Sequence, residues 1–151
     1  MLTIDDKASQ RKAAERLADI FTSLQRSFII TLSKELDRGN VSFPQYHLLG
    51  FLSQQEHLTM TDIAQRMGHT TAAATGLVDR LEKLGHAKRV HAKDDRRKIL
   101  VSITPSGAEL VAEVRNDMVE NLVRMMTHLE PEEQTAWLQI YEKIFPLCQK
   151  C

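Results

Sequence analysis

Residues 85–107 read GHAKRVHAKDDRRKILVSITPSG. Two runs that lean apolar, 87–90 and 99–103, flank a polar segment, 93–98, which holds two acidic and four basic side chains. Because burying so many charges would carry a heavy desolvation cost, the pattern predicts a β-hairpin whose tip points into water. A basic, water-facing tip beside an exposed helix suits contact with both grooves of a duplex. DNA binding is therefore our leading hypothesis.

Charge is unevenly distributed along the chain. The 151 residues carry a formal net charge of zero, so an overall excess of positive charge does not point to nucleic acid. Residues 86–98 nevertheless hold six basic and two acidic side chains, a net charge of +4, whereas residues 109–133 hold two basic and seven acidic side chains, a net charge of −5. One region therefore suits phosphate groups, and the whole-chain sum conceals it.

The composition, 42% hydrophobic and 26% charged, fits one compact unit or a small domain with appended helices. No stretch approaches the roughly 18 consecutive apolar residues of a membrane span, and the N-terminus lacks the apolar core of a signal peptide. We therefore expect a cytoplasmic protein without membrane association.

Helical spacing and capping signals define the first half of the chain. Apolar residues recur at steps of three and four from about residue 8 to residue 37, which predicts one long amphipathic helix that ends at Gly39-Asn40. This helix is longer than the core of a small domain, so part of its apolar stripe needs a partner, and a second subunit is the economical candidate. Capping patterns at Ser42 and Thr59 then predict two shorter helices.

The second of these helices ends at Gly68, and Thr70 or Thr71 caps a further helix that runs to about Leu84. Two helices joined by so few residues have the spacing of a helix-turn-helix. A purely structural helix corner explains this pair equally well when it is taken alone. The basic hairpin directly behind it favours the DNA-binding interpretation.

Proline marks two more helix starts, at Thr104-Pro105 and at Pro131. The predicted order is α-α-α-α-β-β-α-α, a mainly helical protein in which a small β-hairpin wing follows a helix-turn-helix. We expect residues 1–38 to form an N-terminal dimerisation helix, residues 42–104 a winged helix-turn-helix DNA-binding domain, and residues 105–151 the C-terminal dimerisation helices.

Three motifs resemble the MarR family of winged-helix transcriptional regulators, in order and in spacing. They are Asp79-Arg80-Leu81-Glu82-Lys83-Leu84-Gly85, Asp95-Arg96-Arg97 and Val101-Ser102-Ile103-Thr104-Pro105-Ser106-Gly107. In that family they correspond to the end of the recognition helix, the wing and the wing exit, and the likeness extends over nearly the whole chain. The resemblance implies a homodimer that binds double-stranded DNA at a near-palindromic operator, generally as a repressor, with a possible small-molecule inducer.

The resemblance also assigns candidate DNA contacts. Thr59 and Thr61 match the start of the positioning helix, where hydroxyls and helix N-terminal amides hold phosphate. Arg97 matches the wing arginine that reaches the minor groove, and Asp95 the acid that orients it. Further candidates lie on the exposed half of the recognition helix or beside the wing arginine. The full set is Thr59, Thr61, Thr70, Thr71, Ala73, Ala74, Thr75, Arg80, Asp95, Arg96, Arg97 and Lys98.

The recognition-helix segment Ala72–Gly76 departs from many relatives, because it lacks the long basic or amide side chains that make bidentate base contacts. We therefore expect few direct hydrogen bonds to the base edges. We expect specificity to depend on contacts of Thr and Ala methyl groups with thymine, and on groove width sensed by the wing arginines.

Other classes of function receive little support from the sequence. It has no Gly-rich phosphate loop, nucleophile elbow or clustered catalytic carboxylates, so we expect no enzyme and no cofactor. The six histidines are scattered without an i, i+4 pair, which argues against a metal site. Cys148 and Cys151 are expected to be free thiols in a frayed tail.

One alternative stays open, a winged-helix protein-interaction module without sequence-specific DNA binding. The Ala-rich recognition helix and the neutral net charge favour it. The salt dependence of binding to random duplex separates the two hypotheses.

Overall fold

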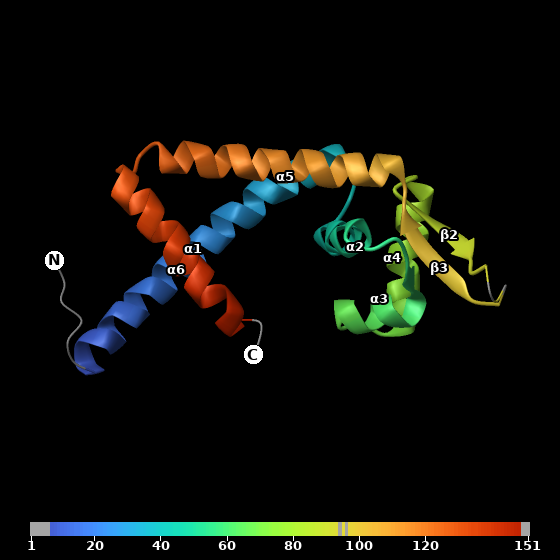
Figure 1. The fold of residues 1–151 in the computed structure, drawn as a ribbon, viewed down its shortest axis with the longest axis horizontal. Helices are drawn as coiled ribbons and strands as arrows, with labels where there is room; N and C mark the ends of the chain where they lie inside the picture. The colour runs from blue at the N-terminus through green and yellow to red at the C-terminus, as the bar shows by residue number, and fades with distance from the viewer. Residues whose placement is uncertain (1–6, 94, 96, 149–151) are drawn as a thin grey trace. The chain divides into compact units, whose positions relative to one another are not determined.

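The computed structural model describes residues 7–93, 95 and 97–148. Figure 1 shows the order of its helices and strands. They are α1 (Lys7–Arg38), α2 (Phe43–Ser53), β1 (Leu58–Thr59), α3 (Met60–Met67), α4 (Thr71–Lys83), β2 (Ala87–His91), β3 (Ile99–Ile103), α5 (Pro105–Met126) and α6 (Pro131–Cys148). The mainly helical winged-helix fold is thus confirmed, with the short strand β1 as an addition. The chain divides into two compact units, one ending at Val114 and the other beginning at Arg115.

Local capping explains where the first helices end and begin. After α1, Asn40 adopts a left-handed conformation with a φ of 51°, and the Val41 N–H donates to the Leu36 carbonyl at 3.1 Å. At the start of α2, the Ser42 N–H donates to Gln45 Oε1 at 2.8 Å, and Pro44 occupies the first turn, where its missing N–H costs nothing.

The three strands form one antiparallel sheet in the order β1-β3-β2. In the hairpin, Ala87 pairs with Ile103 and His91 with Ile99, which confirms the predicted wing. Strand β1 adds Leu58 opposite Val101 on the other side of β3. At the base of the wing, β3 is therefore paired on both sides.

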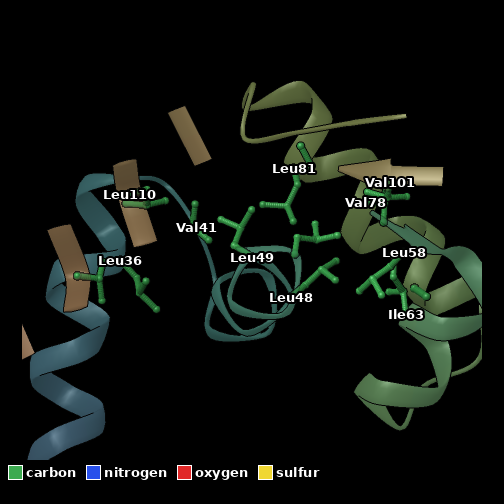
Figure 2. Packing of buried hydrophobic residues seen from close by; sticks show 14 of the residues in the cluster. Leu36, Val41, Leu48, Leu49, Leu58, Ile63, Val78, Leu81, Val101 and Leu110 are labelled. Atoms are coloured by element: carbon green, nitrogen blue, oxygen red, sulfur yellow. The ribbon is translucent and has the colours of Figure 1, made fainter. Parts of the chain in front are cut away.

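The core of the first unit is centred on α2. Leu48, Leu49 and Leu52 are completely buried there, and α2 packs on α4 and β3. Figure 2 shows Leu48 and Leu49 between Leu36 and Leu110 on one side and the residues of α3, α4 and the sheet on the other. The end of α1 and the start of α5 thereby join the same core as the helix-turn-helix.

Both units leave large apolar side chains exposed. On α1 these are Leu17, Ile20, Phe21, Leu24, Phe28, Ile29 and Ile30. In the second unit they are Val119, Leu122, Val123, Met125, Leu138, Ile140, Tyr141, Ile144, Phe145 and Leu147. Such extensive apolar exposure is unusual for a monomer in water.

In the second unit, the end of α5 and α6 form a helical hairpin. Gln134 closes it, since its Nε2 donates to the carbonyls of Met126 and Leu129, both at 3.0 Å. Trp137 and Tyr141 meet edge to face, with ring centroids 6.2 Å apart. An apolar pocket of about 270 Å³ opens there, lined by Leu122, Met126, Gln134, Trp137, Leu138 and Tyr141. Among the described helices, none combines the length and apolarity that a membrane crossing requires.

Candidate nucleic-acid interface

Helices α3 and α4 meet at a tight turn formed by residues 68–70. Gly68 ends α3 in a left-handed conformation with a φ of 63°, which glycine adopts without steric cost. Thr70 then caps α4, its Oγ1 accepting a hydrogen bond from the Ala73 N–H at 3.2 Å. The turn and both helix boundaries are those of a helix-turn-helix.

The N-terminal part of α4 presents a surface of small side chains. Thr70, Thr71 and Ala73 are exposed, and Thr75 is half-buried with its hydroxyl donating to the Thr71 carbonyl at 2.8 Å. Arg80 is exposed farther along the same helix. These five predicted contacts are all accessible to a partner, at least in part.

Ala74 requires a correction. The resemblance predicts that it lies on the exposed face, but its exposure is 0%, and it belongs to the core with Val78 and Leu81. Positions four and seven residues apart lie on one side of a helix, so Ala74 shares the inward face of α4. A buried methyl group cannot contact a base, and Ala74 is no longer a candidate.

At the start of α3, Thr59 and Asp62 form a reciprocal cap. The Thr59 hydroxyl donates to Asp62 Oδ2 at 2.6 Å and accepts from the Asp62 N–H at 3.1 Å, and the Thr59 N–H donates to the same carboxylate at 3.0 Å. The Thr59 donor is therefore used within the protein, and an acid occupies the place where a phosphate was expected. Thr61 remains as the exposed hydroxyl of this turn.

The pKa of Asp62 is lowered. The hydrogen bonds from the side chain and the backbone of Thr59 contribute most to this lowering. Desolvation acts in the opposite direction, and the positive charges of Arg66 and Lys98 contribute least.

At the wing tip, Asp95 accepts two hydrogen bonds, one through its main chain and one through its side chain. Its carbonyl accepts from the Lys98 N–H at 2.9 Å, and its carboxylate accepts from the Arg97 N–H, also at 2.9 Å. Asp95 thus binds the backbone of Arg97, and the side chains of Arg97 and Lys98 are exposed. Arg96, predicted as a phosphate contact, lies outside the described residues.

Arg89 of β2 plays a part that the sequence did not reveal. Its Nη2 lies 2.8 Å from Asp79 Oδ1, its Nη1 pairs with Glu82 Oε2, and its backbone N–H donates to Glu82 Oε1 at 2.8 Å. Burial acts to lower the pKa of Arg89, but the hydrogen bonds and charges of the two acids outweigh it, so the pKa is raised. One of the six hairpin cations is thus neutralised by α4. The signal available in the sequence was the pair of acids one turn apart on that helix.

The wing exit is held to the end of α4 by a dense set of contacts. Thr104 Oγ1 donates to the Gly85 carbonyl at 2.6 Å, and the Thr104 N–H donates to the His86 carbonyl at 3.0 Å. Gly107 is buried in the first turn of α5, where a Cβ atom would lie 2.2 Å from the His86 carbonyl oxygen. Only glycine permits this approach.

The described residues offer no group of three or more His, Cys, Asp or Glu side chains that could hold a metal ion. A tight helix pair with an accessible second helix, followed by a basic hairpin, defines the class of winged helix-turn-helix proteins.

Comparison with known proteins places the chain within this class. Residues 40–98, which run from just before α2 to the residue that precedes β3, match the MarR family. YfiV of Bacillus subtilis (strain 168), described as an uncharacterized HTH-type transcriptional regulator, is 36% identical over 103 residues, which cover 68% of this chain but 62% of YfiV. The transcriptional repressor MdtR of the same organism is 28% identical over 137 residues, 89% of this chain and 88% of MdtR.

The crystal structure of YusO from Bacillus subtilis superposes with a TM-score of 0.73 at 29% identity, covering 89% of this chain and 97% of that one. The chain belongs to the MarR family of winged helix-turn-helix transcriptional regulators. This membership confirms the predicted family, and it confirms a regulator in preference to an enzyme.

Proposed function

We propose that the protein is a sequence-specific repressor that binds double-stranded DNA as a homodimer. In this proposal α4 enters the major groove and the wing tip reaches the adjacent minor groove. The observation that carries it is the placement, on one compact unit, of an accessible surface of small side chains on α4 and an exposed basic tip with Arg97 and Lys98.

The chemistry of α4 predicts how the operator is read. The accessible side chains at its start carry only hydroxyl and methyl groups, which suit phosphates and thymine methyl groups. Discrimination therefore rests in large part on DNA shape, sensed where Arg97 enters a narrow minor groove. Arg80 and Lys98 act on the phosphate backbone.

A second copy of the chain covers the exposed apolar faces. The seven exposed apolar residues of α1 and the exposed stripe of α5 and α6, with the pocket beside Trp137, exceed what a soluble monomer normally exposes. Residues 1–38 and 105–151 thus serve dimerisation, and residues 42–104 serve DNA binding. A two-fold dimer places its α4 helices about 34–36 Å apart, to meet successive major grooves.

Repression and its release follow from this arrangement. MdtR is a transcriptional repressor by its name, and a bound dimer would exclude other proteins from the same duplex. A small-molecule inducer would act by favouring a spacing of the α4 helices that does not fit the operator. The contacts of Thr104 and Gly107 support a mechanical coupling of this kind, since they fix the start of α5 to the wing exit.

Two measurements test the proposal. Binding to random duplex should weaken steeply as salt rises, because each neutralised phosphate releases counterions. A nearly flat salt dependence would favour the alternative of a protein-interaction module. The neutralised Arg89 and the small side chains of α4 are compatible with that alternative. Sedimentation at micromolar concentration should show a dimer, and a stable folded species near 17.2 kDa would contradict it.

A further inference from the structure

We propose that Arg89 is a positioning residue that fixes the wing to α4, so that the wing tip and α4 reach the duplex together. It would do so without contacting DNA itself. The inference rests on the proposed DNA-binding function, and it assigns a role to three residues, Asp79, Glu82 and Arg89, that were not among the candidate contacts.

The geometry of the three groups supports this role. Arg89 lies in the middle of β2, opposite Val101 in the register of the hairpin, and its side chain is 25% exposed. It reaches two acids that are separated by one turn of α4, through a different nitrogen for each. Glu82 also accepts the Arg89 backbone N–H, so strand and side chain are both attached to the helix. A lysine would offer one ammonium point charge and no such fork.

The charges of the cluster argue against a simple electrostatic purpose. Asp79 and Glu82 place two negative charges on the helix that is proposed to enter the major groove, where they repel phosphates. With Arg89 the cluster still carries a net charge of −1. A protein selected only for attraction to DNA gains nothing from these acids. A protein that must hold its wing at a fixed distance from α4 gains a rigid connection.

The two explanations predict opposite signs for one experiment. If the acids matter only as charges, replacing both by their amides, D79N with E82Q, tightens DNA binding and steepens its salt dependence. If they position the wing, the same replacement weakens binding although repulsion has been removed. R89K addresses the arginine separately, because it keeps the positive charge but loses the fork.

The experiment uses the full chain and a duplex that the wild-type protein enriches from a random pool. Dissociation constants are measured over a range of salt concentrations, hydroxyl-radical footprints are recorded, and thermal unfolding verifies that each variant is folded. The matched control is K88Q, which removes an exposed cation from the same strand. Each change is also made together with R97A.

We expect R89K and the double amide variant to bind more weakly than wild type, by no more than R97A does, and to lose the protections made by the wing while keeping those made by α4. In the R97A background neither change should weaken binding further, because the wing contact is already absent, whereas K88Q should be additive with R97A. A merely structural role would lower thermal stability and leave the shape of the footprint unchanged.

Tighter binding by the double amide variant, or additive effects of R89K and R97A, would overturn the proposal. If the amide variant does not fold, R89K decides alone: lost wing protections support positioning, and intact ones refute it. Failure of the DNA-binding function itself is distinguishable, because the wild-type protein would then enrich no duplex and show no salt-dependent binding.

Discussion

Replacing Gly107 by alanine tests whether the close packing at the wing exit stabilises the fold. The added Cβ would lie 2.2 Å from the His86 carbonyl oxygen and 2.9 Å from Ile103 Cγ1. Contacts of Cβ atoms below 3.0 Å essentially never occur, so the His86 carbonyl must move by about 0.8 Å. That carbonyl accepts the Thr104 N–H at 3.0 Å, and its displacement also strains the neighbouring bond from Thr104 Oγ1 to Gly85.

The expected loss is moderate and has a definite sign. Overpacking of a tight site costs about 1–3 kcal/mol, and here the cost should lie in the upper part of that range, about 2–3 kcal/mol, because the obstacle is a backbone carbonyl. Weakening the two hydrogen bonds is part of the same movement and is not added to it. The greater helix propensity of alanine returns about 1 kcal/mol. We therefore expect G107A to lower the free energy of unfolding by about 1–2 kcal/mol.

Urea unfolding followed by circular dichroism measures this loss. The protein concentration is kept fixed, because the proposed dimerisation would contribute to stability. The matched control is G50A in α2, where an added Cβ meets no atom within 4 Å. G50A should leave the free energy of unfolding unchanged or raise it by up to about 1 kcal/mol. If G107A proves as stable as wild type, the contact with His86 relaxes freely and the packing argument is wrong.

Three further perturbations test other parts of the molecule. R97A should weaken operator binding several-fold and reduce its salt dependence, and D95A should have a weaker effect in the same direction. Neither change should alter the free energy of unfolding by more than about 0.5 kcal/mol. Unchanged affinity together with a large loss of stability would show that Asp95 and Arg97 have a structural role. D62N should be less stable than wild type at neutral pH. Because the folded-state pKa of Asp62 is lowered, this difference in stability should persist above about pH 4 and vanish as the pH falls through the lowered value. Unfolding curves at several pH values measure the difference, and a difference that does not change with pH would contradict the prediction. An inducer that disfavours the operator-compatible spacing by about 3 kcal/mol should lower operator affinity roughly a hundredfold. Calorimetry should then show that saturating operator lowers the affinity for the inducer by the same factor. An inducer affinity that operator does not change would rule out the mechanism.

The helix boundaries were predictable because the signals that set them are local. Caps at Thr59 and Thr70 and prolines at 105 and 131 act on the first turn of their own helix, and the structure begins its helices there. The hairpin was predictable for a similar reason, since charged residues at its tip must face water. Strand β1 was not, because two residues form a strand only when β3, about forty residues later, lies beside them.

The candidate site shows the same division between local and distant causes. The basic tip followed from the sequence pattern, and the hydroxyls of α4 followed from the resemblance to the MarR family. Ala74 was misplaced because alanine is compatible with either face, although its spacing from Val78 and Leu81 places it inward. The role of Arg89 was not predictable, because a charge count treats each side chain alone, whereas the two acids that bind Arg89 lie on another element.

The small side chains on the surface of α4 affect how easily the base preference of such a protein can evolve. Ala72, Ala73 and Gly76 are exposed, and a Cβ added at Gly76 would meet no atom within 4 Å. Substitutions by longer side chains at these positions disturb no core packing, so new base preferences can arise by single mutations at little cost in folding free energy. The adjacent Ala74 has no such freedom, because any larger group would enter the core. Relatives that read different operators are therefore expected to diverge at 72, 73 and 76 and to keep a small residue at 74.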